Sequence, residues 1–125
     1  MEIIICPDGD EVARVAAETV AQVCWRVGPD VVLGVATGSS PLALYRDLAA
    51  LVSAGKVDLS GASAFALDEY VGLPEGHPES YAEVIRRTVT EPLGLDPARV
   101  RVPDGRADDI EEACERYELA IRDAG

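Results

Sequence analysis

Two neighbouring carboxylates, Asp68 and Glu69, come directly after an apolar run of strand-like length, residues 62–67. A carboxylate held at the end of a strand is fixed in place and partly desolvated, so Asp68 could serve as a general base. Because consecutive residues of an extended chain point in opposite directions, only one of the pair can face a cavity, while the other turns toward a helix or a neighbouring loop. The alternative is that the pair only caps a turn or is solvated, which the chemistry of the two residues alone favours.

A second apolar run, residues 31–36, leads into a short polar loop ahead of Pro41. The loop consists of Thr37, Gly38, Ser39 and Ser40. Backbone N–H groups at the start of a helix, with three hydroxyl groups beside them, would suit a phosphate. The loop has neither the lysine of a Walker motif nor a GxGxxG pattern. It is equally well explained as an ordinary helix start, in which Ser40 caps the helix and Pro41 takes the first position.

The chain between Glu69 and the next helix carries two more candidates, His77 and Tyr81. His77 is the only imidazole, and it would need a positioned partner to exchange protons, whereas a loop residue needs none, so the loop interpretation is the simpler one. The acidic run at residues 108–112 suits the positive end of a helix dipole before it suits a metal ion. The sequence therefore predicts no metal ligands.

Apolar runs without polar alternation, separated by helical segments, predict a parallel sheet with both faces covered. The predicted strands are residues 2–6, 31–36, 62–67 and 100–102. The predicted helices are residues 10–27, 41–54, 79–90 and 108–123. We expect one α/β domain over residues 1–125, a Rossmann-like three-layer sandwich with helices on both faces of the sheet. Ligands bind such sheets at the carboxyl ends of the strands, so both polar loops should open on the same edge.

The charge balance excludes several classes of partner. The chain has 11 basic and 23 acidic residues in 125, a formal net charge of −12, which argues against a nucleic-acid-binding or anionic-membrane surface. Neither a membrane-spanning run nor a signal peptide is recognisable, and the three cysteines, Cys6, Cys24 and Cys114, fit no metal or disulfide spacing. We expect reduced thiols in a soluble cytoplasmic protein.

The segments VVLGVATGSSPLALY and FALDEYVGLPEGHPESY, in this order, strongly resemble the amino-terminal half of glucosamine-6-phosphate deaminases, also called isomerases. The resemblance implies conversion of glucosamine 6-phosphate into fructose 6-phosphate and ammonia, in which an aldose-ketose isomerisation accompanies hydrolytic loss of the amine. It implies that Asp68 moves a proton between C2 and C1 and that residues 37–40 bind the phosphate. Glu69 matches a residue next to this base, and Tyr81 and His77 match the border of the pocket. No metal or organic cofactor is implied.

Part of the family's pattern is missing from this chain. The family continues with a strand and a GxGxxGHxxFNEP-like loop whose Asp, His and Glu assist ring opening, whereas this chain ends at Gly125. We therefore expect a truncated domain that is inactive alone and that associates with copies of itself or with a complementing carboxy-terminal half. Two other functions stay open: a 6-phosphogluconolactonase, which resembles DER rather than the DEY found here, and a non-catalytic sugar-phosphate binding module.

Overall fold

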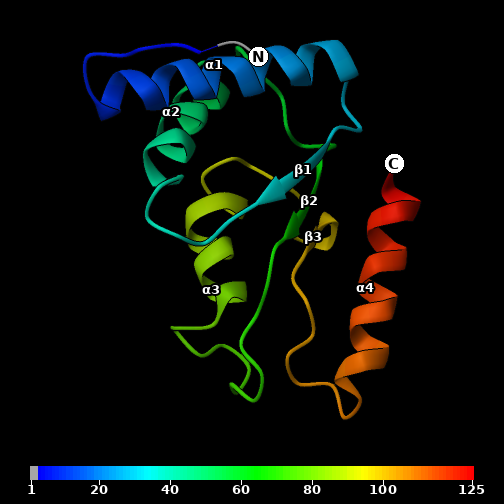
Figure 1. The fold of residues 1–125 in the computed structure, drawn as a ribbon. Coiled ribbons are helices and arrows are strands. Elements are labelled where there is room, and N and C mark those ends of the chain that lie inside the picture. Colours follow the sequence, from blue (N-terminus) through cyan, green and yellow to red (C-terminus); the bar gives the residue numbers. More distant parts are fainter. Residues whose placement is uncertain (1–2) are drawn as a thin grey trace.

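The structure is a computed structural model that describes residues 3–125 (Figure 1). In chain order its elements are α1 (Gly9–Val27), β1 (Val32–Val35), α2 (Leu42–Ser53), β2 (Ser63–Ala66), α3 (Tyr81–Ile85), the π-helical turn η1 (Arg86–Thr90), the 3-10 turn η2 (Pro97–Arg99), β3 (Val100–Arg101) and α4 (Ile110–Ala124). Strands and helices therefore alternate as the apolar runs predict, except at the amino terminus.

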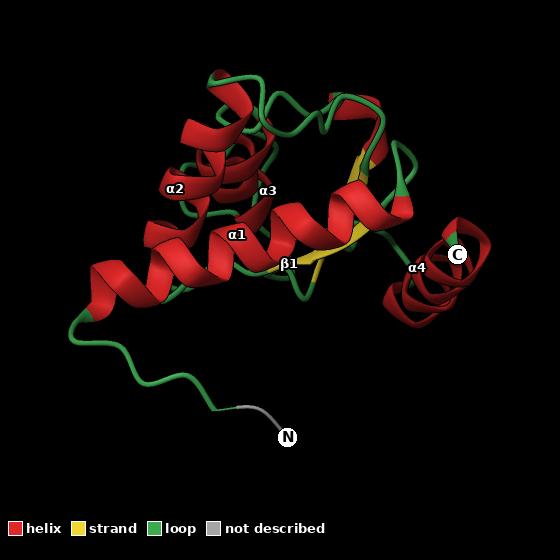
Figure 2. Ribbon diagram, turned by 90° about the horizontal axis from the view of Figure 1, so that it is seen from above, coloured by secondary structure: helices red, strands yellow, loops and turns green. Residues whose placement is uncertain are grey.

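The strands form one parallel sheet in the order β1-β2-β3, in which Val35 of β1 lies opposite Ala66 of β2. Because side chains alternate between the two faces, Ala66 and Phe65 point to opposite sides. Ala66 belongs to the main core, whereas Phe65 meets the ring of Tyr117 on α4 edge-on, with the ring centroids 5.8 Å apart. Figure 2 shows α2 and α3 on one side of the sheet and α4 by itself on the other. The predicted α/β class, a parallel sheet with helices on both faces, is confirmed.

Helix α1 begins and ends where its sequence signals indicate. Asp8 caps it by accepting a hydrogen bond from the Glu11 N–H at 2.9 Å, and Gly28 ends it with a φ of 97°, a conformation that glycine adopts readily. Near its end the Trp25 indole N–H donates to the Lys56 carbonyl at 2.7 Å and so joins α1 to the turn after α2. Neither α1 nor any other helix formed by residues 3–125 has the length and apolar content needed to cross a bilayer.

The largest fully buried side chains lie on the face of the sheet that α2 and α3 cover. They are Leu48, Leu59, Ile85, Leu93 and Val89. Small residues of α1 complete this core, since Ala17 and Ala21 are both buried and allow the helix to approach closely. Burial of apolar surface on this side therefore holds the helices α1 to α3 against the sheet.

The predicted amino-terminal strand does not form. Ile3, Ile4 and Ile5 are 73%, 58% and 92% exposed, and residues 3–6 are irregular; Glu2, the first residue of the predicted strand, lies outside the described residues. A strand needs a neighbour for its backbone N–H and C=O groups, and within residues 3–125 none lies beside this segment. Residues 3–5 have the apolar composition of a strand, but composition does not specify a pairing partner, and residues 3–125 supply none.

Three helices begin later than predicted: α2, α3 and α4, the last of which begins at Ile110 after its cap Asp109 rather than at residue 108. Helix α3 begins at Tyr81, because the Ser80 hydroxyl accepts from the Glu83 N–H at 3.3 Å and ends the preceding loop. Its last part is a π-helical turn, in which the Glu91 N–H donates to the Arg86 carbonyl at 3.0 Å. Helix α2 begins at Leu42, so Pro41 precedes the first helical residue, and Ser40 does not cap the helix.

Candidate active site

The two polar loops leave neighbouring strands at the same edge of the sheet. Val35 and Ala66 are the last paired residues of β1 and β2, and Thr37 and Asp68 each follow two positions later. Because the strands are parallel, both loops open at the carboxyl edge, where α/β sheets bind ligands. The predicted juxtaposition of the residue 37–40 loop and Asp68 is therefore found in the backbone of the structure.

A tyrosine side chain holds the backbone immediately before the residue 37–40 loop. The Ala36 N–H donates to the Tyr45 hydroxyl at 3.0 Å, and this hydroxyl donates in turn to the Ala36 carbonyl, also at 3.0 Å. Tyr45 is buried, and burial raises the pKa of its phenol. In the sequence, the only signal that marks Tyr45 is its position four residues after Pro41, on the buried face of α2.

The start of α2 differs from that of the other long helices. The side chains of Asp8 and Asp109 cap α1 and α4, but within residues 3–125 no side chain caps α2. The Leu42 N–H instead donates to the Ser39 carbonyl at a long 3.3 Å. Ser39 and Ser40 are exposed, so their hydroxyls lie at the surface beside the positive end of the α2 dipole.

Asp68 and Glu69 face different surroundings. Asp68 is exposed at the end of β2. Glu69 is only partly exposed and turns toward α3: its Oε1 accepts from the Tyr70 and Tyr81 N–H groups, both at 2.8 Å, and its Oε2 accepts from the Ala82 N–H at 2.9 Å. The structure thus directs Glu69 at a helix and leaves Asp68 exposed at the sheet edge, an arrangement that agrees with both of the outcomes stated for the pair.

Tyr81 and His77 occupy different parts of the loop. The Tyr81 and Tyr70 hydroxyls are 3.2 Å apart, and their ring centroids are separated by 4.7 Å. The hydrogen bond to Tyr81 is the main cause that raises the pKa of the Tyr70 phenol. His77 Nδ1 accepts from the Glu79 N–H at 3.1 Å, and the backbone N–H of His77 donates to the Pro74 carbonyl at 3.2 Å. Both hydrogen bonds are local to this turn, and a part for His77 in the site stays a prediction.

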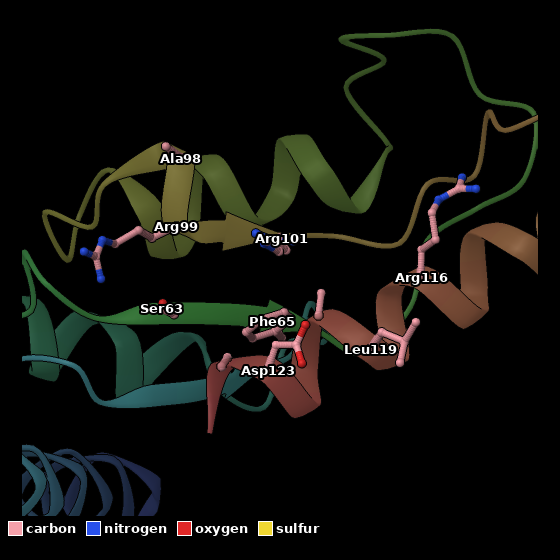
Figure 3. A pocket seen from close by; sticks show the side chains of 10 residues that line it. Ser63, Phe65, Ala98, Arg99, Arg101, Arg116, Leu119 and Asp123 are labelled. Carbon is pink, nitrogen blue, oxygen red and sulfur yellow. The ribbon is translucent and has the colours of Figure 1, made fainter.

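A cavity of about 380 Å³ lies between the loop that follows β2 and the connection between β3 and α4. Glu69, Tyr70 and Gly105 are among its lining residues, but the residue 37–40 loop, Asp68 and His77 are not. A larger groove of about 510 Å³ lies between α4 and the sheet, where Phe65 and Leu119 face it (Figure 3). It contains none of the predicted site residues. Residues 38–40 and Asp68 are exposed at the edge of the sheet and line neither of these two cavities.

Within residues 3–125 no group of three or more histidine, cysteine, aspartate or glutamate side chains has the arrangement of a metal site. The site offers backbone N–H groups and hydroxyls as donors and one exposed carboxylate, Asp68, as an acceptor. The N–H groups and hydroxyls at the start of α2 can bind an anion, and Asp68, on the loop that follows the neighbouring strand, can accept a proton.

Comparison with known proteins places this chain in a family. A family model described as glucosamine-6-phosphate isomerases/6-phosphogluconolactonase matches residues 7–125. The chain belongs to this family. A glucosamine-6-phosphate deaminase of Cutibacterium acnes is 56% identical over 124 residues, which are 99% of this chain and 47% of that relative. One of Pseudarthrobacter chlorophenolicus is 51% identical over 125 residues, 100% of this chain and 48% of the relative.

Solved structures of the family agree with the fold. A monomeric glucosamine-6-phosphate deaminase matches with a TM-score of 0.90 and 32% identity, covering 98% of this chain and 51% of that chain. The 6-phosphogluconolactonase of Thermotoga maritima matches with a TM-score of 0.75 and 22% identity over 98% of this chain, which is a likeness of fold. The chain thus spans about half the length of the family members that it matches, as the missing part of the sequence pattern predicted.

Proposed function

We propose that the protein acts on glucosamine 6-phosphate as an aldose-ketose isomerase and deaminase, with its phosphate site and its proton-transfer base in this chain. The observation that carries the proposal is the pairing of Val35 with Ala66, which sets a hydroxyl-rich loop beside an exposed carboxylate at one sheet edge. The identity to glucosamine-6-phosphate deaminases along the whole chain supports this substrate.

In the proposed reaction the phosphate binds to residues 37–40, through hydroxyls and the N–H groups at the start of α2. Asp68 removes the proton from C2 of the open-chain sugar and returns it to C1, while a second proton moves from the amine nitrogen to O1, so that the C1 aldehyde and C2 amine become a C1 alcohol and a C2 imine. Water then adds to the imine carbon and ammonia leaves, giving fructose 6-phosphate. Every atom comes from the sugar or from water, so the steps that this chain performs need no cofactor.

Opening of the sugar ring is not assigned to any residue of this chain. The matched relatives are about twice as long, and we propose that ring opening depends on residues outside the matched half. The 125 residues alone should therefore bind glucosamine 6-phosphate without releasing ammonia at an enzymatic rate. We also propose that these residues associate with a complementing half or with further copies of the chain. A cytoplasmic location belongs to the same proposal.

The test is a partial reaction that does not require enzymatic ring opening. Fructose 6-phosphate opens spontaneously in solution, so the chain can be incubated with fructose 6-phosphate and ammonium chloride in D2O, and deuterium at C1 followed by proton NMR. We expect incorporation by the unmodified chain. Asp68→Asn should slow it by at least about 100-fold, the scale of a lost general base, while binding of glucosamine 6-phosphate, measured by calorimetry, changes little.

Asp108→Asn is the matched control, because Asp108 is an exposed acid in the connection before α4. It should leave both binding and incorporation unchanged. Binding without incorporation in the unmodified chain would contradict the catalytic proposal and indicate a non-catalytic binding module. If Asp68→Asn abolished binding and incorporation equally, its role would be structural.

A 6-phosphogluconolactonase is the second candidate, favoured by the fold likeness and by the family description. It would hydrolyse an ester and would not exchange a carbon-bound proton. Tyr70 in the DEY sequence, where the lactonases resemble DER, argues for the deaminase. Hydrolysis of 6-phosphogluconolactone by the unmodified chain, without deuterium incorporation into fructose 6-phosphate, would reverse that preference.

A further inference from the structure

Asp68 lies on a short stretch of chain that is fixed on both sides. Before it, Ala66 is paired in the sheet, and the Ala66 carbonyl also accepts from the Tyr117 hydroxyl at 2.7 Å. After it, Glu69 is bound to the start of α3. Only Leu67 and Asp68 lie between these points, so the direction of the Asp68 side chain depends on both attachments.

The Glu69 carboxylate uses both oxygens in its attachment. It accepts three backbone N–H groups at 2.8 to 2.9 Å, two of them from Tyr81 and Ala82 at the start of α3. Hydrogen bonds to an ionised acceptor are stronger than those between neutral groups, and a carboxylate at a helix start also gains from the helix dipole. To exchange a proton with a substrate, this carboxylate would have to leave the helix that it caps.

The connection between β3 and α4 holds the same loop from the other side. The Gly72 N–H donates to the Gly105 carbonyl at 2.8 Å. A Cβ atom on Gly105 would lie 2.1 Å from the Tyr70 carbonyl oxygen and 3.3 Å from Glu69 Cγ, too close for any other residue. Gly105 does not have a positive φ, so the close approach of the two loops, rather than backbone conformation, requires the glycine here.

We propose that Glu69 and Gly105 are positioning residues: Glu69 ties the base loop to α3, Gly105 lets the β3–α4 connection close over it, and together they fix Asp68 at the sheet edge. Glu69 takes no part in proton transfer. The role of Asp68 rests on the proposed function, whereas the two attachments themselves can be tested without any substrate.

The attachments are tested by amide hydrogen exchange of the unliganded chain, comparing Glu69→Gln with Glu79→Gln. Glu79 is an exposed acid of the same loop, so its variant makes the same charge change without touching α3. In Glu69→Gln the side-chain NH2 would face an N–H donor, and we expect the Tyr81 and Ala82 amides to exchange at least about tenfold faster, with Gly72 accelerated as well. Unchanged exchange at Tyr81 and Ala82 would overturn the proposal.

The effect on Asp68 is tested with deuterium incorporation into fructose 6-phosphate. Glu69→Gln should slow incorporation about tenfold or more, leave the binding of inorganic phosphate unchanged, and keep the shape of the pH profile, because Glu69 is not the titrating group. Loss of one limb of the pH profile would overturn the proposal and make Glu69 a proton-transfer residue. If the unmodified chain shows no incorporation and no phosphate binding, the proposed function fails. The amide hydrogen exchange experiment still shows whether Glu69 holds the start of α3.

Gly105→Ala provides a second route that leaves the Glu69 carboxylate in place. Its methyl group should displace the base loop and accelerate exchange at Gly72 by about tenfold or more, because the bond to the residue 105 carbonyl is strained or lost. Gly9→Ala is the control, since no atom lies within 4 Å of the added Cβ there. If the Gly72 amide exchanged at the same rate in Gly105→Ala and Gly9→Ala, the positioning role proposed for Gly105 would be overturned.

Discussion

A single hydroxyl fixes the point where β1 becomes the residue 37–40 loop. Tyr45 both accepts from and donates to the backbone of Ala36, at 3.0 Å in each direction, and its side chain is buried against the core. The loop itself is exposed, so its shape depends on this contact at one end and on the start of α2 at the other. In the proposed phosphate site, the placement of the donors therefore begins inside the core rather than in the loop.

Replacing Tyr45 with phenylalanine should loosen this loop without unfolding the chain. The Ala36 N–H and C=O would lose their partner, which we expect to cost about 1 to 2 kcal/mol of unfolding free energy and to weaken the binding of both inorganic phosphate and glucosamine 6-phosphate by about fivefold or more. Urea unfolding and calorimetry give the two quantities.

Tyr117→Phe is the matched control for this change. It also removes a hydroxyl that is bound to backbone carbonyls, those of Ala66 and Arg101, but does so on α4. It should lower stability by a similar amount and leave phosphate binding unchanged. Equal weakening of phosphate binding in both variants would show that the Tyr45 effect is one of general stability.

Among the residues of α4, only Ala113 is buried. This helix alone covers its face of the sheet, and Tyr117 contacts β2 and β3 at once: its ring meets Phe65, and its hydroxyl lies 2.7 Å from the Ala66 carbonyl and 3.1 Å from the Arg101 carbonyl. The groove of about 510 Å³ beside it shows that side chains do not fill the rest of this interface (Figure 3). The docking of α4 therefore depends strongly on one residue.

The docking of α4 should weaken at high pH. Burial raises the pKa of Tyr117 to about 12 from the ordinary value of 10. A phenol with a raised pKa in the folded state contributes stability that is fully present below pH 10 and is lost as the pH rises toward 12. Urea unfolding at pH 8, 10 and 11.5 should show this loss, and Tyr117→Phe should reduce it. Some loss should remain, because the pKa values of Tyr45 and Tyr70 are raised as well. Parallel curves for the two proteins would contradict the assignment to Tyr117.

The elements differ in how far the sequence could predict them. β1, β2 and the extent of α1 follow from local signals, an apolar run or the helical spacing of apolar residues, so these predictions succeeded. The isoleucines at residues 3–5 carry the same apolar signal as β1, but a strand also needs a neighbour, which no local pattern specifies. The direction of Glu69 depends on Tyr81, twelve residues away, and on the path of the loop between them. The role of Asp68 stays a prediction.

At the scale of the whole molecule, negative charge is in large excess. The chain has 12 more acidic than basic residues, and the ion pairs within residues 3–125 are formed by arginines at or near the surface. Exposed pairs of this kind contribute little each, whereas the unpaired acids repel one another in the compact state. In the proposed function a phosphosugar approaches this surface against the overall field, so the proposed site depends on local N–H and hydroxyl donors.

Moderate salt should therefore stabilise the chain. Raising sodium chloride from about 10 to about 150 mM shortens the Debye length from roughly 30 to roughly 8 Å and screens the repulsion. We expect the thermal midpoint to rise by a few degrees, about what 1 kcal/mol gives for a domain of this size. A fall in the midpoint would mean that the surface ion pairs contribute more than the excess charge costs.

The hydrogen bond between Trp25 and the Lys56 carbonyl gives the molecule a built-in optical reporter. Trp25 is the only tryptophan, and its side chain is 61% exposed. It lies at the end of α1, shortly before the amino end of β1, whereas the proposed site lies at the carboxyl edge of the sheet. Its fluorescence emission should change when α1 separates from the turn after α2 and stay constant when a sugar phosphate binds. Unlabelled protein can thus report unfolding and ligand binding as separate events.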